Sequence, residues 1–386
     1  MADLERAKIK VGFIPIIDCA AIVLAEELGA YERQGLEVEI RREVSWANVR
    51  DKLALGVLDA SHILAPLPLA LTLGIDSVSV SVPMINAMTL EVNGNALTLS
   101  QSLWREMEEA APQFMGNGRA PLDARAIAAV VARRAASGAK PLVLASVFPY
   151  SPQNYMLRLW LSSAGLDPDR DVRLAVVPPP HTVAYLSGGA IDGYCVGEPW
   201  NQQSEALGIG RIAITGPDIW KGMPEKVLGT TESWAANNPN TLRALIKALI
   251  EACLWLDEPA NRAEAARILS SPRYLNMPAE VMSRTLDLPD FHIFQRNAAN
   301  FPWRSHADWF LAQMVRWKQA PADTDIKAVA DRVYRTDIYR AAAREMNVAC
   351  PEVDRLPPGG HGEPLLPSPD DRSSTETKAG VACGSN

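Results

Sequence analysis

Four side chains that could hold a small anion follow predicted strands or stand at a predicted crossing between two lobes. Trp46 opens a helix and carries an indole N–H, and Asn95 follows an asparagine-glycine pair. Gln153 lies in the first turn of another helix, and Lys226 adds a positive charge. Indole, amide and ammonium groups donate hydrogen bonds, and a helix start adds free backbone N–H groups. These positions predict a binding site for an oxyanion, with no catalytic residue.

Each of these positions also has a purely structural interpretation. Trp46 could fill the core, and Asn93-Gly94-Asn95 has the composition of a hairpin turn. The segment before Gln153 could cap its helix without binding a ligand, and Lys226 could be a solvated surface lysine. The sequence alone leaves these alternatives open.

Four neighbouring residues are predicted to support the site. Ser151 is a good helix cap and Asn154 lies in the same helical turn. Gly94 belongs to the turn before Asn95. Glu198, after another strand, is expected to brace the lobes rather than to contact an anion.

Several classes of enzyme are disfavoured by the motifs that are missing. The sequence has no G-x-x-x-x-G-K-[ST], G-x-G-x-x-G, H-E-x-x-H, G-x-S-x-G or C-x-x-C motif. Its five histidines and five cysteines are scattered without metal-ligand spacing. We therefore expect no metal, no cofactor and no enzymatic activity.

Composition limits the class of protein further. The chain has 386 residues, 48% of them apolar and 22% charged, as in soluble globular proteins. The net charge of −7 disfavours direct binding of nucleic acid. No long apolar run predicts a membrane span, and the first residues do not resemble a secretion signal, so a cytoplasmic location is expected. A leader removed before this starting methionine would leave the same sequence.

The order of predicted elements indicates an α/β protein with two lobes. Strands alternate with helices up to about residue 200, which favours βαβ units on mostly parallel sheets, and helices then dominate. We predict lobe 1 over 8–98 plus 228–344 and lobe 2 over 99–227. The chain would cross between them near 97–100 and again near 226–231. Residues 351–386 have the proline- and glycine-rich, acidic composition of a disordered tail.

Several segments together resemble a known family. They are SWANVRDKLALGVLDASHILAPLPLAL, VNGNA, IDGYCVGEPWNQQ and MPEKVL, in order between about residues 8 and 320. They are similar to the nitrate/bicarbonate-binding family of ABC-transporter solute receptors. The resemblance implies a type II periplasmic-binding-protein fold with an oxyanion between the lobes.

The resemblance also assigns roles to residues. By motif, the pocket tryptophan falls on Trp46, the polar donors on Asn95 and Gln153, and the cation on Lys226. A lysine at that last position favours nitrate or nitrite over a metal-assisted bicarbonate site. Two departures from the transport branch stand out: Gln153 replaces a common histidine, and Asn95 replaces a common glutamine.

Within the family, this chain is most similar to the members without a secretion signal, which are cytoplasmic nitrate/nitrite sensors of the NasS type. The resemblance then implies a partner, an RNA-binding antiterminator of the NasT (ANTAR) type, which is released when the anion binds. One alternative is the substrate-binding component of a nitrate ABC transporter. A less favoured alternative is an enzyme like the thiamine-pyrimidine synthases, which share this lobed fold.

Overall fold

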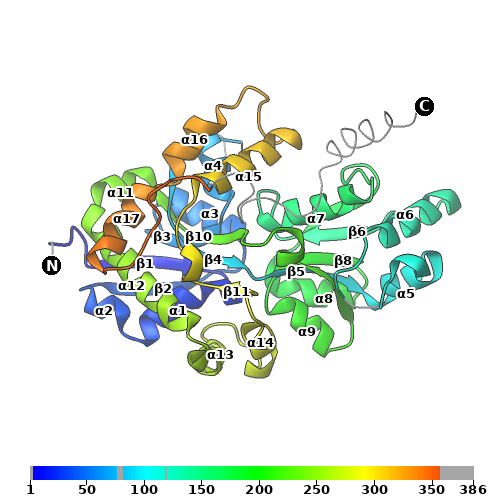
Figure 1. Cartoon of the computed structure of the whole chain (residues 1–386), viewed down its shortest axis with the longest axis horizontal. Coiled ribbons are helices and arrows are strands. Elements are labelled where there is room, and N and C mark those ends of the chain that lie inside the picture. The colour runs from blue at the N-terminus through cyan, green and yellow to red at the C-terminus, as the bar shows by residue number, and fades with distance from the viewer. Residues whose placement is uncertain (1–2, 76–80, 118–119, 357–386) are drawn as a thin grey trace, which may run out of the picture.

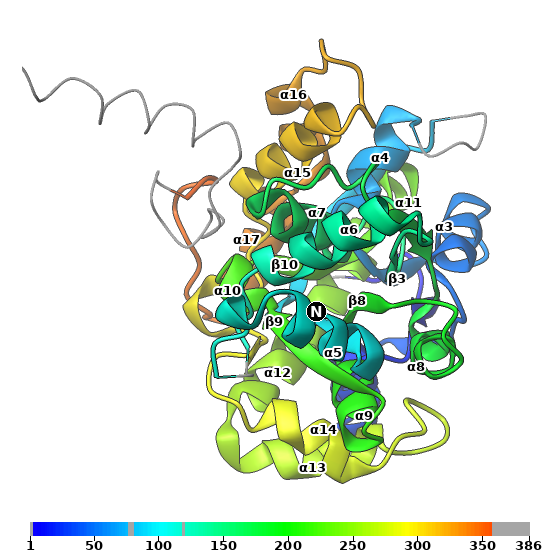
Figure 2. The same ribbon diagram turned by 90° about the vertical axis from the view of Figure 1, so that its right-hand side faces the viewer.

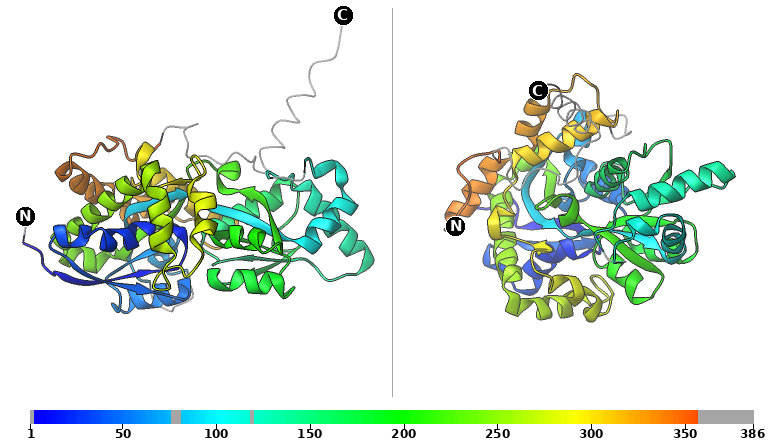
Figure 3. Two further views of the ribbon diagram at one scale, coloured as in Figure 1. Left: turned by 90° about the horizontal axis from the view of Figure 1, so that it is seen from below. Right: turned by 45° about the vertical axis from the view of Figure 1, so that its right-hand side comes forward.

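The computed structural model describes residues 3–75, 81–117 and 120–356. Across these residues the chain forms two β-sheets, which lie side by side along the longest axis of the molecule (Figure 1). Helices cover both sheets, so the predicted α/β class is confirmed. The two views in Figure 3 show the sheet-centred lobes toward opposite ends of this axis.

The first sheet combines strands from distant parts of the chain. Its strand order is β11 (His292–Ile293), β4 (Met84–Asn93), β10 (Pro224–Thr231), β3 (Ala60–Leu64), β1 (Lys8–Phe13) and β2 (Glu37–Arg42). β1 pairs in parallel with β2 and β3, whereas β10 is antiparallel to both β3 and β4. The sheet is therefore mixed rather than mostly parallel, because a strand from residue 224 onward inserts between β3 and β4.

The second sheet has the same mixed character. Its strand order is β7 (Arg173–Val176), β6 (Val143–Ser146), β8 (Gly193–Gly197), β5 (Asn95–Ser100) and β9 (Gly210–Thr215). β6 is parallel to β7 and β8, and β5 is antiparallel to β8 and β9. The helices α5 to α9 surround this sheet (Figure 2).

The helices fall into three consecutive groups along the chain. The first group is η1 (Ile17–Cys19), α1 (Ala20–Glu27), α2 (Ala30–Arg33), α3 (Trp46–Ala54) and α4 (Leu67–Leu73). The second is α5 (Gln101–Ala110), η2 (Pro112–Phe114), α6 (Arg125–Ser137), α7 (Pro152–Ser163), η3 (Pro179–His181), α8 (Thr182–Ser187), α9 (Trp200–Ala206) and α10 (Gly216–Ile219). The third is α11 (Glu232–Asn237), α12 (Pro239–Asp257), η4 (Pro259–Asn261), α13 (Arg262–Leu269), α14 (Ala279–Leu286), η5 (Arg296–Ala298), α15 (Arg304–Arg316), α16 (Ile326–Val333) and α17 (Thr336–Glu345).

The chain passes from the first sheet to the second at Gly94. The hairpin interpretation of this turn is wrong, because β4 pairs with β10 and β11 whereas β5 pairs with β8 and β9. The backbone of Gly94 is held by other segments: its N–H donates to Phe291 O, and its carbonyl accepts from Glu198 N, each at 3.0 Å. The return to the first sheet lies between Thr215 and Pro224. Both crossings thus differ by a few residues from those predicted, since 97–100 and 226–231 are already inside β5 and β10.

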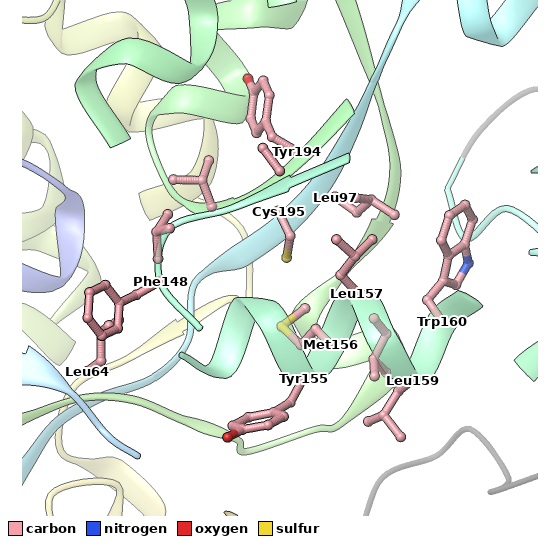
Figure 4. Packing of buried hydrophobic residues seen from close by; sticks show 14 of the residues in the cluster. Leu64, Leu97, Phe148, Tyr155, Met156, Leu157, Leu159, Trp160, Tyr194 and Cys195 are labelled. Carbon is pink, nitrogen blue, oxygen red and sulfur yellow. The ribbon is translucent and has the colours of Figure 1, made fainter. Parts of the chain in front are cut away.

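A large apolar cluster joins the two lobes. It includes Ile63 and Leu64 of β3 together with Phe148 and Tyr155 from the second lobe. Figure 4 shows how Met156 and Leu157 of α7 lie close to Cys195 and Leu97 of the second sheet. A second cluster, built largely on α1 and α12, fills the first lobe. Tight burial of these side chains fixes where the strand ends meet.

The start of the predicted tail is bound to the first lobe. Asp354 pairs with Arg304 and Arg340, at 2.7 and 2.6 Å, and Arg355 pairs with Asp308 at 2.7 Å. The prediction of disorder is therefore wrong for residues 351–356. The rest of the tail, 357–386, lies outside the described residues. Within the described ranges, no helix is both long enough and apolar enough to span a membrane.

Candidate functional site

The four predicted ligand-binding residues are all buried where the two sheets meet. Trp46 is the first residue of α3, Asn95 begins β5, Gln153 lies in the first turn of α7 and Lys226 is on β10. The structure places them in one chain of contacts, together with further residues. We call this set the polar cluster: Asp18, Trp46, His62, Asn95, Gln153, Glu225 and Lys226.

Lys226 is a buried ion-pair partner, not a surface lysine. Its side chain is 0% exposed, and its Nζ lies 2.5 Å from Asp18 Oδ2 and 3.0 Å from Glu225 Oε2. The alternative of a solvated surface lysine is therefore wrong. Burial acts to lower the pKa of Lys226, but the two carboxyl groups hold it above its usual value, so the ammonium stays charged.

Gln153 joins the two lobes through its amide nitrogen. Nε2 donates to Asn95 Oδ1 at 2.7 Å and to Glu225 Oε2 at 2.9 Å. Asn95 in turn directs its own amide nitrogen to Met156 Sδ, at 3.7 Å. The two amides predicted to donate to an anion therefore donate to protein atoms here, and they link β5 and α7 to β10.

Trp46 forms one wall of the polar cluster. Lys226 Nζ lies 5.6 Å from the centre of its indole ring, and the His62 ring lies 5.3 Å away. Among the described residues its Nε1–H has no hydrogen-bond partner, although the atom is buried. A buried donor without an acceptor costs free energy, so this N–H is well suited to a ligand oxygen.

His62 is one of the five histidines that lack metal-ligand spacing in the sequence. Its Nδ1 accepts from Ile14 N at 3.4 Å, which leaves Nε2 as the protonated nitrogen. Nε2 is buried and has no partner within the described part of the chain. Burial and the nearby Lys226 charge hold the pKa of His62 well below its usual value, so the ring is neutral. The packing of His62 against Trp46 in the folded chain identifies its Nε2–H as a second candidate donor, which the sequence did not indicate.

Asp18 does not cap the helix that follows it. Cys19 is the N-cap of α1 and makes no side-chain cap bond, while Asp18 turns toward Lys226. A Cβ on Gly197 would lie 3.4 Å from Asp18 Oδ2, in ordinary contact, so β8 of the second lobe lies next to Asp18. The acidic residues of the cluster, Asp18 and Glu225, are the main functional candidates that sequence reasoning missed. The adjacency of Glu225 to Lys226 was the signal for one of them.

The four predicted supporting residues have different roles. Ser151 Oγ caps α7 by accepting from Asn154 N at 3.0 Å, and the Asn154 amide donates to Pro149 O at 2.7 Å, so both stabilise their own loop. Glu198 braces the lobes through its backbone: its carbonyl accepts from Ile17 N at 2.8 Å, and its N–H donates to Gly94 O. Its carboxyl group is buried, which raises its pKa to about 8.

The arrangement can donate hydrogen bonds to one small anion between the lobes. It offers a fixed ammonium, an unpartnered indole N–H and a neutral imidazole N–H, all withdrawn from water. Acceptor atoms also lack partners among the described residues, namely Asp18 Oδ1, Gln153 Oε1 and Glu225 Oε1. No group of three or more metal-ligating side chains occurs in residues 3–75, 81–117 and 120–356.

Comparison with known proteins decides the family. A model described as the NMT1-like family matches residues 2–270. The chain belongs to this family. This membership of the NMT1-like family agrees with the family resemblance found in the sequence. The relatives confirm that resemblance. The nitrate/nitrite binding protein NrtA of Synechocystis sp. is 33% identical over 92% of this chain and 80% of its own length.

Solved structures confirm the fold expected for this NMT1-like chain. The periplasmic nitrate-binding protein NrtA from Synechocystis matches with a TM-score of 0.82 and 30% identity, over 96% of this chain and 98% of that one. The fold is therefore that of periplasmic binding proteins. The first relatives found are transport proteins, such as the bicarbonate transport ATP-binding protein CmpC of Synechococcus elongatus, which is 35% identical over 90% of this chain. The chain spans about half the length of these ATP-binding relatives.

Proposed function

We propose that this protein binds nitrate or nitrite in the polar cluster between its lobes. The observation that carries the proposal is the buried Lys226 against the face of Trp46, whose indole N–H is unpartnered within the described residues. The NrtA relatives, whose names specify nitrate and nitrite, support this choice of anion.

The chemistry of nitrate suits such a site. The anion is planar, monovalent and weakly hydrated, and its oxygens only accept hydrogen bonds. A hydrogen bond to a charged group contributes roughly 1.5–3 kcal/mol net. Lys226 with two or three neutral donors could therefore give micromolar affinity, which corresponds to about −8 kcal/mol after the ordering costs.

Isothermal titration of the purified protein with nitrate, nitrite, bicarbonate and sulfate tests this proposal. We expect micromolar binding of nitrate or nitrite and much weaker binding of sulfate, because one buried lysine does not balance two charges. Absence of heat with both nitrate and nitrite, at concentrations up to millimolar, would reject the proposed ligand.

At the cellular level we infer a cytoplasmic sensor that releases an antiterminator of the NasT type when the anion binds. Gln153 and Asn95 differ from the pattern common in the transport branch, and this difference supports a separate role. A sensor of this kind requires that the partner prefer the ligand-free conformation. Titrating nitrate into a preformed complex with the antiterminator tests the inference, and a complex that survives saturating nitrate contradicts it.

The alternative is a solute-binding component or domain of a nitrate transporter. The match to CmpC and NrtC, whose names specify transport of bicarbonate and nitrate, favours this alternative. Fractionation of cells that make the natural protein separates the two proposals. Recovery with the cytosol supports the sensor, whereas recovery with the periplasm or with transporter subunits supports the transport role.

A further inference from the structure

The two oxygens of Glu225 have different surroundings. Oε2 accepts hydrogen bonds from Gln153 Nε2 at 2.9 Å and from Lys226 Nζ at 3.0 Å. Oε1 is buried and, within the described ranges, has no hydrogen-bond partner. In a neutral carboxyl group one oxygen accepts and the other donates through its hydroxyl hydrogen. The contacts therefore match a carbonyl oxygen at Oε2 and a hydroxyl group at Oε1.

The charges around Lys226 favour the same state of Glu225. Asp18 lies closer to the ammonium, at 2.5 Å against 3.0 Å, and is its better counter-ion. A second ionised carboxylate would give this buried group a net charge of −1, which would repel an incoming anion. When Glu225 is neutral, the charges of the Lys226 ammonium and the Asp18 carboxylate cancel. A bound anion then adds the only uncompensated charge.

Groups on the neighbouring elements do not stabilise an ionised Glu225. Asp18 acts to raise the pKa of Glu225. Burial holds the pKa of Glu91 on β4 well above its usual value, even though Arg262 acts to lower it. Burial raises the pKa of the Cys195 thiol on β8, so it stays neutral, and His62 on β3 is neutral as well. Burial raises the pKa of Glu225 itself to about 8, even though Lys226 acts to lower it.

We propose that one proton lies between Glu225 Oε1 and an oxygen of the bound anion. Nitrate and nitrite carry no proton, so each requires a protonated Glu225, and where Glu225 is ionised each would bind together with a proton taken up from solvent. Bicarbonate carries its own hydroxyl hydrogen and can donate it to an ionised Glu225. The inference rests on the proposed binding of the anion in the polar cluster, and it names the residue that distinguishes proton-free from proton-bearing oxyanions.

Calorimetric titration of nitrate between pH 6 and pH 9.5, in buffers with different ionisation enthalpies, measures the protons taken up. Below about pH 7 we expect little dependence of affinity on pH, because Glu225 is already protonated. Above about pH 8 the uptake should approach one proton per nitrate, and the affinity should fall toward about tenfold per pH unit. Bicarbonate, titrated in parallel, should show no such uptake.

The variant Glu225→Gln separates the proton from the rest of the site. Its amide can accept from Lys226 and Gln153 and donate to the anion, so the variant replaces the titrating proton of Glu225 by N–H hydrogens that do not titrate. Its affinity should no longer depend on pH up to 9.5. A matched control is Glu106→Gln on α5, whose carboxylate is paired with Arg134 in the second lobe, and it should keep the wild-type pH profile.

Two results would overturn the inference. One is a wild-type nitrate affinity that stays constant to pH 9.5 without proton uptake, and the other is a Glu225→Gln variant that keeps the wild-type pH slope. The wild-type buffer comparison decides the question alone if this variant does not fold. Failure of the wild type to bind nitrate or nitrite at any pH is a different result, because it rejects the binding site together with the inference.

Discussion

At the scale of single residues, burial changes the role of Lys226. The sequence presents it as one cation beside a glutamate, whereas the structure makes it the only charge that balances Asp18 within the polar cluster. The buried ammonium of Lys226 is held in place by the carboxyl groups of Asp18 and Glu225. Its remaining N–H is available to a ligand. The same residue therefore contributes to folding and to anion binding.

Replacing Lys226 should consequently affect both properties. Lys226→Met leaves Asp18 buried without its cation, which should lower the free energy of unfolding by roughly 3–5 kcal/mol. Nitrate affinity should fall at least tenfold. Urea unfolding and calorimetry measure the two effects.

A double variant distinguishes the two roles of the lysine. Lys226→Met with Asp18→Asn removes both charges and should recover much of the stability but none of the binding. Lys247→Met, a lysine paired with Glu345 on the outer helices, serves as the control and should leave affinity unchanged. Full nitrate affinity in the double variant would contradict a role of Lys226 in binding.

Trp46 offers a test of its unpartnered N–H. Trp46→Phe keeps an aromatic wall beside Lys226 but removes the donor, so affinity for nitrate should fall by about 1–2 kcal/mol, roughly five- to thirtyfold. Trp104→Phe in the second lobe is the matched control, since its indole donates to Glu108 at 3.1 Å and not to the cluster. Equal calorimetric affinities for both variants would show that the indole N–H does not contact the ligand.

At the scale of elements, local signals located most helices but not the strands that cross between sheets. Helix α12, 239–257, carries strong local signals, because its length, its apolar face and the proline at its first position all favour a helix. The helical segment after residue 20 is divided into α1 and α2, where Gly29 adopts a φ of 70°. Strands β4 and β10 pair with segments more than a hundred residues away, so their local sequence does not define their partners.

Gly94, between β4 and β5, has a backbone conformation and a lack of space that favour glycine. Its φ is 78°, and an added Cβ would lie 2.1 Å from Glu91 Oε1 and 3.0 Å from His292 Nδ1. Gly94→Ala should lower the free energy of unfolding by more than the roughly 1–3 kcal/mol of backbone strain alone. Gly138→Ala, also at positive φ (69°) but with nothing within 4 Å of the added Cβ, measures that strain by itself. Equal losses for the two variants in urea unfolding would contradict a packing role for Gly94.

At the scale of the whole molecule, buried acids make stability depend on pH. Burial raises the pKa of Glu198 and of Glu225 from 4.5 to about 8. Between these values the folded protein keeps protons that the unfolded chain releases. Above about pH 7, where the buried histidines no longer act in the opposite direction, the free energy of unfolding therefore falls as pH rises toward 8.

The prediction is a melting temperature that decreases from pH 7 to pH 8.5, a range in which the buried histidines are largely neutral in both the folded and the unfolded chain. Glu198→Gln should reduce this slope, because the amide has no proton to lose, while Glu106→Gln should keep it. Thermal unfolding followed by circular dichroism at each pH measures the slopes. A melting temperature that rises over this range in the wild type would contradict the buried, protonated state of these acids.

The α/β class, the family resemblance and four residues of the polar cluster could be predicted without a structure. These predictions follow from periodicity, motif order and side-chain chemistry, all of which are local. The burial of Lys226 and its shared contacts with Asp18 and Glu225 could not be predicted in this way. Nor could the hydrogen bond that Gln153 donates across the lobes to Glu225. The physical reason is that burial and partnership depend on which distant segments meet, and at Gly94 and β10 the chain changes sheets in a way that no local pattern encodes.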